Sequence, residues 1–319
     1  MQCFILAGGF ATRLWPLTEK RAKPLLPLAG KPLITYLIEK IPKDLPITVS
    51  TNAVFKDAFE KWKKGMKRSV DILIEDTVQD DHKLGALGAV AQWIREKNID
   101  DDVLLLTGDN YCGFSFEDFL HTFHGITLIA VYDIHKTDRA KLYGTVITNQ
   151  NTVTGFEEKP IQPKTTLINT GASVLPSHIL PILTEWAISH PDNIGGIFEE
   201  LLRRKQHIEC FRFSEPWFDI GSFDTYLEAT TTLVGDNIIS SGSISPDSKI
   251  EGSVVIGSHS QVIKSNLHNV VLFENCHITD CVLENCIIDD NSTLSHVDLT
   301  HKMIREGTIL VPKGSPWET

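Results

Sequence analysis

The stretch that decides the fold is the first apolar run with the residues after it, Gln2-Cys3-Phe4-Ile5-Leu6-Ala7-Gly8-Gly9-Phe10-Ala11-Thr12-Arg13-Leu14. A compact apolar run that ends in a glycine pair predicts a buried strand followed by a tight turn. The backbone N–H groups of such a turn can face a phosphate, because glycine carries no Cβ that would block the approach. We therefore expect a strand here that leads directly into an anion-binding loop.

A basic segment follows this turn. Between Arg13 and Lys31 the chain carries five cations and one acid, a local net charge of +4, whereas the whole chain has a net charge of −11. A glycine pair alone is usually a turn, and a basic run alone is usually a solvated surface. Found together after the first strand, they indicate a polyanion site. Neither the P-loop pattern nor G-x-G-x-x-G is present, which disfavours a dinucleotide cofactor.

Outward from this stretch, residues 1–235 alternate short apolar runs with helical patterns. The alternation predicts an α/β domain with a Rossmann-like, mostly parallel sheet sandwiched by helices. Ligands of such sheets bind beyond the carboxyl ends of the strands, here the loops after Ala7, Glu75 and Thr107. The expected strands are Gln2–Ala7, Ile47–Thr51, Val70–Glu75 and Val103–Thr107, and the expected helices are Pro32–Lys40, Val54–Lys64 and Ala86–Lys97.

The pattern changes in residues 236–319. Aliphatic residues recur every six positions between small polar spacers, and the interval then shortens to five or six. This beat predicts a second domain, a short parallel β-helix of hexapeptide-like units with about three coils of roughly 18 residues. Cys276, Cys281 and Cys286 follow the same beat, so we expect them to be core residues stacked on successive turns. The aliphatic positions are Ile244, Ile250, Ile256, Val262, Leu267, Phe273, Ile278, Leu283, Ile288 and Leu294.

Length and charge exclude several classes of protein. The 319 residues are enough for two domains, each with its own core. The net charge of −11 argues against a nucleic-acid or membrane-surface binder, since both need a cationic face. The N-terminus lacks the basic start of a signal peptide, and no apolar run approaches the roughly 20 residues that span a bilayer. Six sparse cysteines fit free thiols, so we expect a cytoplasmic protein.

The glycine pair with Thr12-Arg13-Leu14 and Lys23-Pro24-Leu25-Leu26-Pro27 resembles the sugar-1-phosphate nucleotidylyltransferases, also called nucleotide-sugar pyrophosphorylases. The family usually has Gly where Ala11 stands. The C-terminal repeat resembles the left-handed β-helix of several members, which here would mediate homo-oligomerisation or regulation. Further matches follow in order: Leu84-Gly85-Ala86-Leu87-Gly88-Ala89, Gly108-Asp109-Asn110, Tyr143-Gly144-Thr145-Val146, Phe156-Glu157-Glu158-Lys159-Pro160, Asn169-Thr170-Gly171 and Trp217-Phe218-Asp219-Ile220-Gly221.

The resemblance implies a reaction in which a sugar 1-phosphate attacks the α-phosphorus of a nucleoside triphosphate and expels pyrophosphate. Such chemistry needs alignment and charge neutralisation more than covalent help from the protein. Arg13 would clamp the β- and γ-phosphates with its fork of donors, and Lys23 would lie near the α-phosphate. With these two, Asp109 would complete the catalytic set. The nucleotide-binding residues would be Leu6, Ala7, Gly8, Gly9, Thr12, Arg13 and Gly85.

The resemblance also implies a metal. Asp109 and Asp219 would converge on one Mg²⁺, whose octahedral preference suits two carboxylates with phosphate oxygens and waters. Each aspartate follows a short apolar or aromatic run, where a plain turn or helix cap is the common alternative. Zinc is disfavoured, since no Cys/His cluster has ligand spacing.

The sugar phosphate would contact Gly144, Glu158, Lys159 and Asn169. Glu158 would accept hydrogen bonds from sugar hydroxyls, and Lys159 would bind the phosphate. The substrate pair stays open: glucose 1-phosphate with a thymidylyl or uridylyl donor is preferred, and mannose 1-phosphate with a guanylyl donor is the alternative. Gln79-Asp80-Asp81-His82 replaces a shorter linker, and its role in base selection is open. More distant alternatives are a non-catalytic regulatory subunit and a second, acyltransferase activity in the β-helix.

Overall fold

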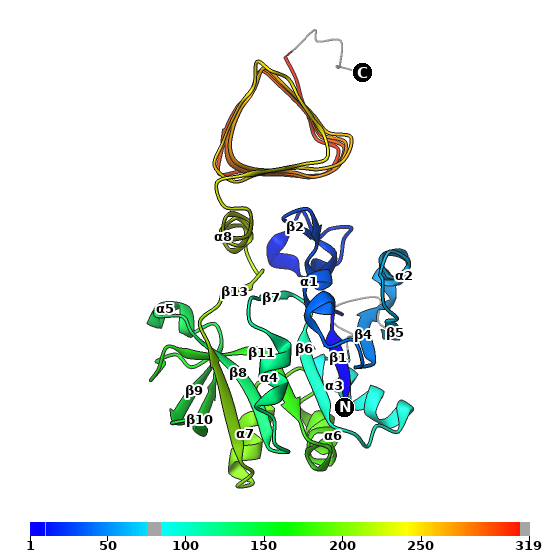
Figure 1. Cartoon of the computed structure of the whole chain (residues 1–319), viewed down its shortest axis with the longest axis vertical. Coiled ribbons are helices and arrows are strands. Elements are labelled where there is room, and N and C mark those ends of the chain that lie inside the picture. Colours follow the sequence, from blue (N-terminus) through cyan, green and yellow to red (C-terminus); the bar gives the residue numbers. More distant parts are fainter. Residues whose placement is uncertain (10, 76–83, 313–319) are drawn as a thin grey trace. The chain divides into compact units, whose positions relative to one another are not determined.

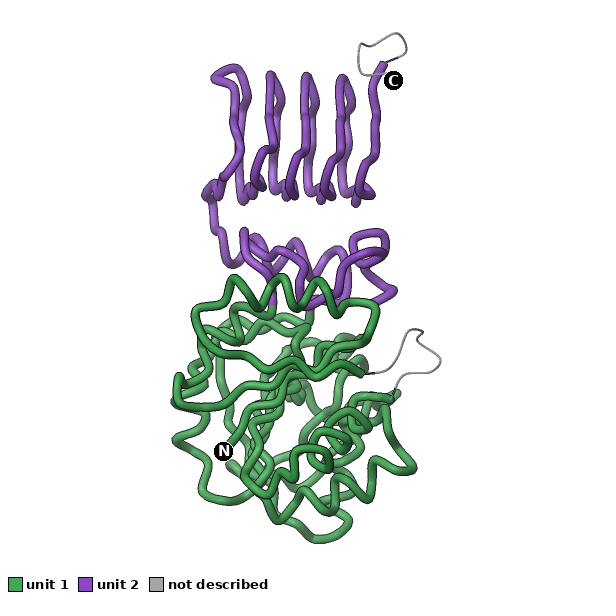
Figure 2. Tube along the Cα trace, turned by 90° about the vertical axis from the view of Figure 1, so that its right-hand side faces the viewer, with its two compact units in different colours: residues 1–10, 34–219 green, residues 11–33, 220–319 purple. Residues whose placement is uncertain are grey.

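The computed structural model describes residues 1–9, 11–75 and 84–312. It divides into two compact units, Met1–Phe10 with Ile34–Asp219, and Ala11–Leu33 with Ile220–Thr319 (Figure 2). The basic segment therefore belongs to the same unit as the C-terminal repeat. Gln79-Asp80-Asp81-His82 lies outside the described residues.

The first unit is built on a nine-stranded sheet in the order β5-β4-β1-β6-β11-β8-β12-β10-β9 (Figure 1). Strands β5, β4, β1 and β6 pair in parallel, and β11 runs antiparallel between β6 and β8. The predicted α/β Rossmann-like fold is confirmed, and the four expected strands match to within one residue at each end. The sheet is mixed rather than mostly parallel, because β10 is antiparallel to both β12 and β9, as β11 is to β6 and β8. The strands are β1 (Gln2–Leu6), β4 (Ile47–Asn52), β5 (Asp71–Glu75), β6 (Val103–Thr107), β8 (Thr127–Asp133), β9 (Gly144–Asn149), β10 (Thr152–Glu158), β11 (Leu167–Leu175) and β12 (Ile208–Phe213).

Three expected helices are present. Ala86–Lys97 is found as predicted, Pro32–Lys40 begins one residue later, and Val54–Lys64 begins as a 3₁₀ turn (Ala53–Phe55) that continues into α2. The helices described in this unit are α1 (Leu33–Lys40), α2 (Lys56–Lys64), α3 (Ala86–Lys97), α4 (Phe116–His121), α5 (Thr137–Ala140), α6 (Leu180–Ser189) and α7 (Gly196–Arg203).

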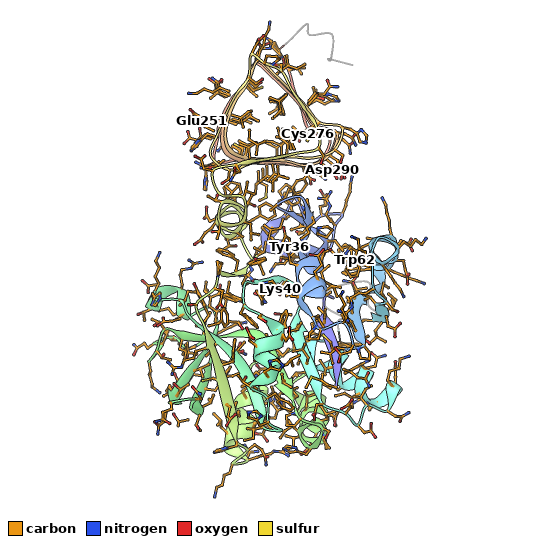
Figure 3. All side chains as sticks on the ribbon, viewed as in Figure 1. Tyr36, Lys40, Trp62, Glu251, Cys276 and Asp290 are labelled. Atoms are coloured by element: carbon orange, nitrogen blue, oxygen red, sulfur yellow. The ribbon has the colours of Figure 1, made fainter. Side chains whose placement is uncertain are left out.

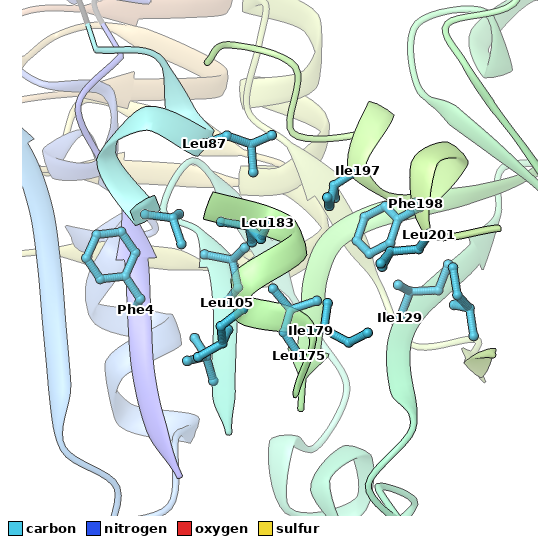
Figure 4. Packing of buried hydrophobic residues seen from close by; sticks show 14 of the residues in the cluster. Phe4, Leu87, Leu105, Ile129, Leu175, Ile179, Leu183, Ile197, Phe198 and Leu201 are labelled. Atoms are coloured by element: carbon cyan, nitrogen blue, oxygen red, sulfur yellow. The ribbon is translucent and has the colours of Figure 1, made fainter. Parts of the chain in front are cut away.

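Helices cover both faces of this sheet, as alternation along β12 demonstrates. Ile208 and Cys210 belong to the apolar core that α3, α6 and α7 build with the sheet (Figure 4). Phe211 points to the opposite face and contacts Phe119 of α4, with ring centroids 5.4 Å apart. In the core itself, Phe4 of β1 packs on Trp93 of α3 at 4.6 Å between ring centroids. The helices packed on the two faces hold the sheet in place, and the predicted loops begin at the ends of its strands.

The second unit contains the predicted left-handed β-helix. Its coils form a triangle seen end-on in Figure 1 and lie stacked in Figure 2. Helix α8 (Phe223–Val234) precedes it and begins with a capping box between Ser222 and Thr225. The strands are β14 (Ile238–Ser240), β15 (Ser243–Ile244), β16 (Lys249–Glu251), β17 (Val254–Ile256), β18 (Gln261–Ile263), β19 (Asn266–Leu272), β20 (His277–Thr279), β21 (Val282–Ile288), β22 (Thr293–Ser295), β23 (Asp298–Thr300), β24 (Met303–Ile304) and β25 (Ile309–Leu310).

The coil length corrects the sequence prediction. Ile244 pairs with Val262, which is 18 residues on, but later partners such as Ile278 and Leu294 are 16 residues apart. The shortened beat of five and six residues is the reason, since three such sides add up to 16. Regular pairing extends from Ile238 to Leu310, beyond the predicted three coils.

Two side-chain assignments also change. The inward position between Ile256 and Ile288 is held by Leu272, whereas Phe273 is buried outside this core. Cys276, Cys281 and Cys286 are core residues as predicted (Figure 3 labels Cys276), but a spacing of five places them on successive sides of one coil rather than on successive turns. All six cysteines are free and buried.

The corners of the β-helix use a left-handed backbone. Asn269 and Asn285 occupy one corner in successive coils with φ near 50°, and the Asn269 amide donates to Asn285 Oδ1 at 3.2 Å. Asn275 and Asn291 repeat the arrangement at another corner, at 3.3 Å. Asparagine tolerates this backbone region better than other non-glycine residues. These four asparagines of the repeat are therefore corner residues.

Candidate active site

The two predicted metal ligands, Asp109 and Asp219, lie on or beside two paired strands of the first unit. Strand β7 (Asn110–Cys112) pairs antiparallel with β13 (Trp217–Asp219), and this register sets Asp219 opposite Asn110. Asp109 directly precedes Asn110. Cross-strand partners project their side chains to the same face, about 5 Å apart. The pairing thus brings Asp219 next to the loop that carries Asp109, although the two residues are far apart in the sequence.

Asn110 organises this loop. Its amide nitrogen donates to the Thr107 hydroxyl and, at 3.3 Å, to Asp109 Oδ1. Its Oδ1 is buried and has no hydrogen-bond partner in the described structure. Two carboxylates and an unsatisfied amide oxygen are oxygen donors, the kind that Mg²⁺ prefers. The described residues contain no group of three or more His, Cys, Asp or Glu side chains arranged for a metal, so a magnesium ion here would need phosphate oxygens and water as well.

A lysine that the sequence analysis did not single out supports the same loop. Lys40, at the end of α1, directs its ammonium group at three consecutive carbonyls, those of Cys112, Gly113 and Phe114, at 2.6–3.3 Å. It also lies over the Tyr111 ring at 5.6 Å (Figure 3 labels Lys40). Because a lysine at a helix end is common, nothing local in the sequence points to this role.

The glycine-pair loop lies beside the aspartate loop. The Gly108 N–H donates to the Leu6 carbonyl at 2.7 Å, and the Ala7 N–H donates to the Ser50 carbonyl at 2.8 Å. A Cβ on Gly8 would meet Glu75 Oε1 at 2.8 Å, so the Glu75 carboxyl packs directly against this glycine and would have to shift to admit a larger residue. Gly9 has open space around it. Asn52 fixes the turn by donating to the Gly8 carbonyl at 2.9 Å.

Glu75 is a buried carboxyl under this loop and was also missed. It is 5% exposed, and burial raises the pKa of Glu75 above its usual range, opposed by the Ser50 hydroxyl, which donates to Oε1 at 2.5 Å. We predict that Glu75→Gln raises the melting temperature at pH 7 by about 2 °C, because the variant no longer buries a charge.

The pH dependence of that gain gives its test. A raised pKa in the folded state means that the ionised carboxylate destabilises the fold above that pKa. The gain should therefore be full above the folded pKa and vanish below the unfolded value of about 4.3. Thermal unfolding of both proteins between pH 4 and pH 8 measures it. A gain that is independent of pH would contradict this account.

Gly85 begins helix α3 at a close approach of two segments. Its φ is +77°, and a Cβ there would lie 2.4 Å from the Pro191 carbonyl oxygen. The Gly88 N–H donates to the same oxygen at 3.0 Å. Gly85 thus directly precedes the helix and also packs closely against Pro191.

The predicted sugar-phosphate residues form a second group in the first unit. Gly144 of β9 pairs with Glu158 of β10, and a Cβ on Gly144 would lie 2.8 Å from Glu158 Oε2. From the other side, a Cβ on Gly195 would lie only 1.8 Å from the same oxygen. Burial raises the pKa of Glu158, an effect that Lys159 opposes and Glu199 reinforces. Gly195 and Glu199 were not anticipated.

Lys159 and Asn169 complete this group. Lys159 adopts φ of 45°, and its ammonium nitrogen lies 3.7 Å from Glu158 Oε1. Asn169 Oδ1 accepts the Gly171 N–H at 3.4 Å, and a Cβ on Gly171 would meet the Thr107 hydroxyl at 2.3 Å. Thr107 is the residue that accepts from Asn110. Strand β11, which carries Asn169, therefore packs against the end of β6 from which the aspartate loop begins.

The remaining predicted residues belong to the second unit. Thr12 and Arg13 form a 3₁₀ turn (Thr12–Leu14) in which Arg13 is exposed, and Lys23 begins another (Lys23–Leu25), where it is only 6% exposed. Ala11 adopts φ of 49°, which lies in the backbone region that favours glycine. Glycine is also the residue that the resembled family usually has at this position.

Comparison with known proteins places these features in a family. The profile described as nucleotidyl transferase matches residues 2–235. The chain belongs to the nucleotidyl transferase family. A second profile, described as GlmU-like, C-terminal hexapeptide, matches residues 223–298. In the described part of this family member no helix is both long and apolar enough to cross a membrane.

Three relatives illustrate the similarity. The "Bifunctional sugar-1-phosphate nucleotidylyltransferase/acetyltransferase" of Sulfurisphaera tokodaii is 31% identical over 82% of this chain and 63% of its own length. The "Bifunctional protein GlmU" of Methanococcus aeolicus is 28% identical over 82% of this chain and 62% of its own length. The "Mannose-1-phosphate guanylyltransferase" of Mycobacterium tuberculosis is 24% identical over 88% of this chain and 82% of its own length. The chain thus spans less than two thirds of the first two relatives.

Proposed function

We propose that the protein transfers a nucleotidyl group from a nucleoside triphosphate to a sugar 1-phosphate. An oxygen of the sugar phosphate attacks the α-phosphorus, the bond from that phosphorus to the bridging β-phosphate oxygen breaks, and pyrophosphate leaves. The observation that carries the proposal is the pairing of β7 with β13, which sets Asp219 opposite the neighbour of Asp109. Family membership over residues 2–235 supports it.

The cations of the basic segment bind the triphosphate in this proposal. Arg13 clamps the β- and γ-phosphates and stabilises the leaving pyrophosphate, since its planar fork suits phosphate oxygens. Lys23 neutralises charge at the α-phosphate. The N–H groups of Gly8 and Gly9 face the phosphates, and Leu6, Ala7, Thr12 and Gly85 complete the nucleotide subsite.

Asp109 and Asp219 would hold Mg²⁺. When bound, the ion offsets the repulsion between two phosphates that approach each other. Asn110 keeps the Asp109 carboxylate oriented through its 3.3 Å hydrogen bond. On the acceptor side, Glu158 accepts hydrogen bonds from sugar hydroxyls, Lys159 binds the sugar's phosphate, and Gly144 and Asn169 shape the subsite.

Two substrate pairs are candidates. The sequence favours glucose 1-phosphate with a thymidine or uridine triphosphate. Mannose 1-phosphate with guanosine triphosphate is supported by the names of several relatives, among them the M. tuberculosis protein and the "Mannose-1-phosphate guanyltransferase" of Eremothecium gossypii. We also propose a cytoplasmic location, which is consistent with the free cysteines. We further propose that residues 1–235 form the catalytic domain and that the β-helix of residues 236–319 mediates homo-oligomerisation.

A pyrophosphate-release screen tests the proposal. Five nucleoside triphosphates are combined with glucose, mannose, galactose and N-acetylglucosamine 1-phosphates, with Mg²⁺ and with excess EDTA. We expect turnover with at least one pair, abolished by EDTA and restored by added Mg²⁺. Turnover with no pair would move the proposal to a non-catalytic subunit, and turnover unaffected by EDTA would reject the metal assignment.

A further inference from the structure

Arg21, in the basic segment of the second unit, is held by the β-helix of the same unit. Its Nη1 donates to Asp289 Oδ1 at 3.1 Å, and its Nη2 pairs with Asp290 Oδ2. Its guanidinium carbon lies 5.1 Å from the centroid of the Phe273 ring. The Asp289 side chain is only 4% exposed, so this is a desolvated, charge-assisted contact rather than a surface ion pair.

The contacts on the β-helix form a column. Phe273, Asp289 and Arg305 each follow an inward residue, Leu272, Ile288 and Ile304, and these pair in register in successive coils. Phe273 and Asp289 hold Arg21. Arg305 pairs with Glu19 and lies 5.6 Å from the centroid of the Trp15 ring. One face of three successive coils therefore carries an aromatic ring, an acid and a base, and each of them contacts a residue between Trp15 and Arg21.

A second anchor lies a few residues further along. The Tyr226 hydroxyl of α8 donates to the Pro27 carbonyl, and the Tyr226 ring lies 6.4 Å from that of Phe273. Lys23 lies between the anchors, two residues after Arg21 and four before Pro27. Its turn is closed by the Leu26 N–H, which donates to the Lys23 carbonyl at 3.0 Å. Both ends of the turn that carries Lys23 are therefore fixed to the C-terminal part of the chain.

We propose that Arg21 is a positioning residue and that the β-helix, through Asp289, holds the Lys23 turn in its catalytic geometry. The inference rests on the proposed nucleotidyl transfer, in which Lys23 acts on the α-phosphate. Phosphoryl-type transfer depends on the alignment of the reacting groups. Loss of one anchor of the Lys23 turn should therefore lower kcat even where the turn keeps its fold. The β-helix thus serves the reaction directly, besides any role in assembly.

The test compares Arg21→Met, Asp289→Asn and the double variant with the parent chain. We expect kcat to fall on the order of 100-fold in each single variant, with KM for both substrates changed much less. The double variant should be no slower than the slower single variant, because both substitutions break one contact. Asp289→Asn keeps the side chain's shape and remains informative if Arg21→Met folds poorly.

Amide hydrogen exchange of the segment Ala11–Leu33 gives a readout that does not need turnover. Exchange should accelerate in both variants but not in Lys249→Met, which breaks an exposed ion pair with Glu251 elsewhere on the β-helix. Folded variants with unchanged kcat, or with unchanged exchange in this segment, would overturn the inference. A parent chain that turns over no substrate pair would overturn the proposed function instead, and the exchange result would then decide alone whether the β-helix orders the Lys23 turn.

Discussion

Replacing Asp109 by Asn is expected to lower the turnover of the protein on the order of 10³-fold at saturating substrates. The variant keeps a side-chain oxygen that can still accept from Asn110, which now donates to Asp109 Oδ1 at 3.3 Å, so the loop between β6 and β7 should keep its shape. What it loses is one of two negative charges. A magnesium ion held by Asp109 and Asp219, as proposed above, would depend on that charge.

Steady-state pyrophosphate release at increasing Mg²⁺ concentration measures the effect. Asp109→Asn and Asp219→Asn should both need more Mg²⁺ for half-maximal rate, and the double variant should lose little beyond either single one, because the two carboxylates act as a unit. Asp71→Asn, at the exposed start of β5, is the matched control and should leave the rate unchanged. An unaltered Mg²⁺ dependence in Asp109→Asn would refute the metal assignment.

The elements that the sequence predicts well are those set by local chemistry. Strand β6 is four buried aliphatic residues and a threonine bounded by turn residues, and α3 directly follows Gly85, so the sequence predicts the bounds of both elements. The first glycine of the pair was assigned to phosphate access. The structure adds a packing contact, since a Cβ on Gly8 would meet the Glu75 carboxyl, which would have to shift.

What the sequence could not predict depends on partners that are far away along the chain. Nothing near Glu158 in the sequence indicates that its carboxyl packs against Gly195, where a Cβ would lie 1.8 Å from Oε2. Likewise, Phe273 fits the aliphatic beat, and only the 16-residue coil reveals that Leu272 points inward while Phe273 faces Arg21. Periodicity gives the face of an element, whereas the identity of what covers that face is a tertiary property.

The other large effect concerns Lys23. We expect Lys23→Met to lower kcat on the order of 10³-fold in both the synthetic and the pyrophosphorolytic direction, with a smaller change in KM. The side chain is 6% exposed, and methionine fills a similar volume without the charge, so the 3₁₀ turn should persist. A charge that acts on the transition state affects kcat, whereas one that merely attracts substrate affects KM.

Lys20→Met provides the matched control for this variant. Lys20 lies in the same segment and pairs with Glu306 at 3.2 Å, but its side chain is 69% exposed. A solvated pair of this kind contributes little to stability, so this variant should keep nearly full activity. If both lysine variants lost activity equally, the segment would act through its overall charge rather than through one placed cation. Because Lys23 is held between the Arg21 and Pro27 anchors and Lys20 is not, placement predicts that only the first loss is large.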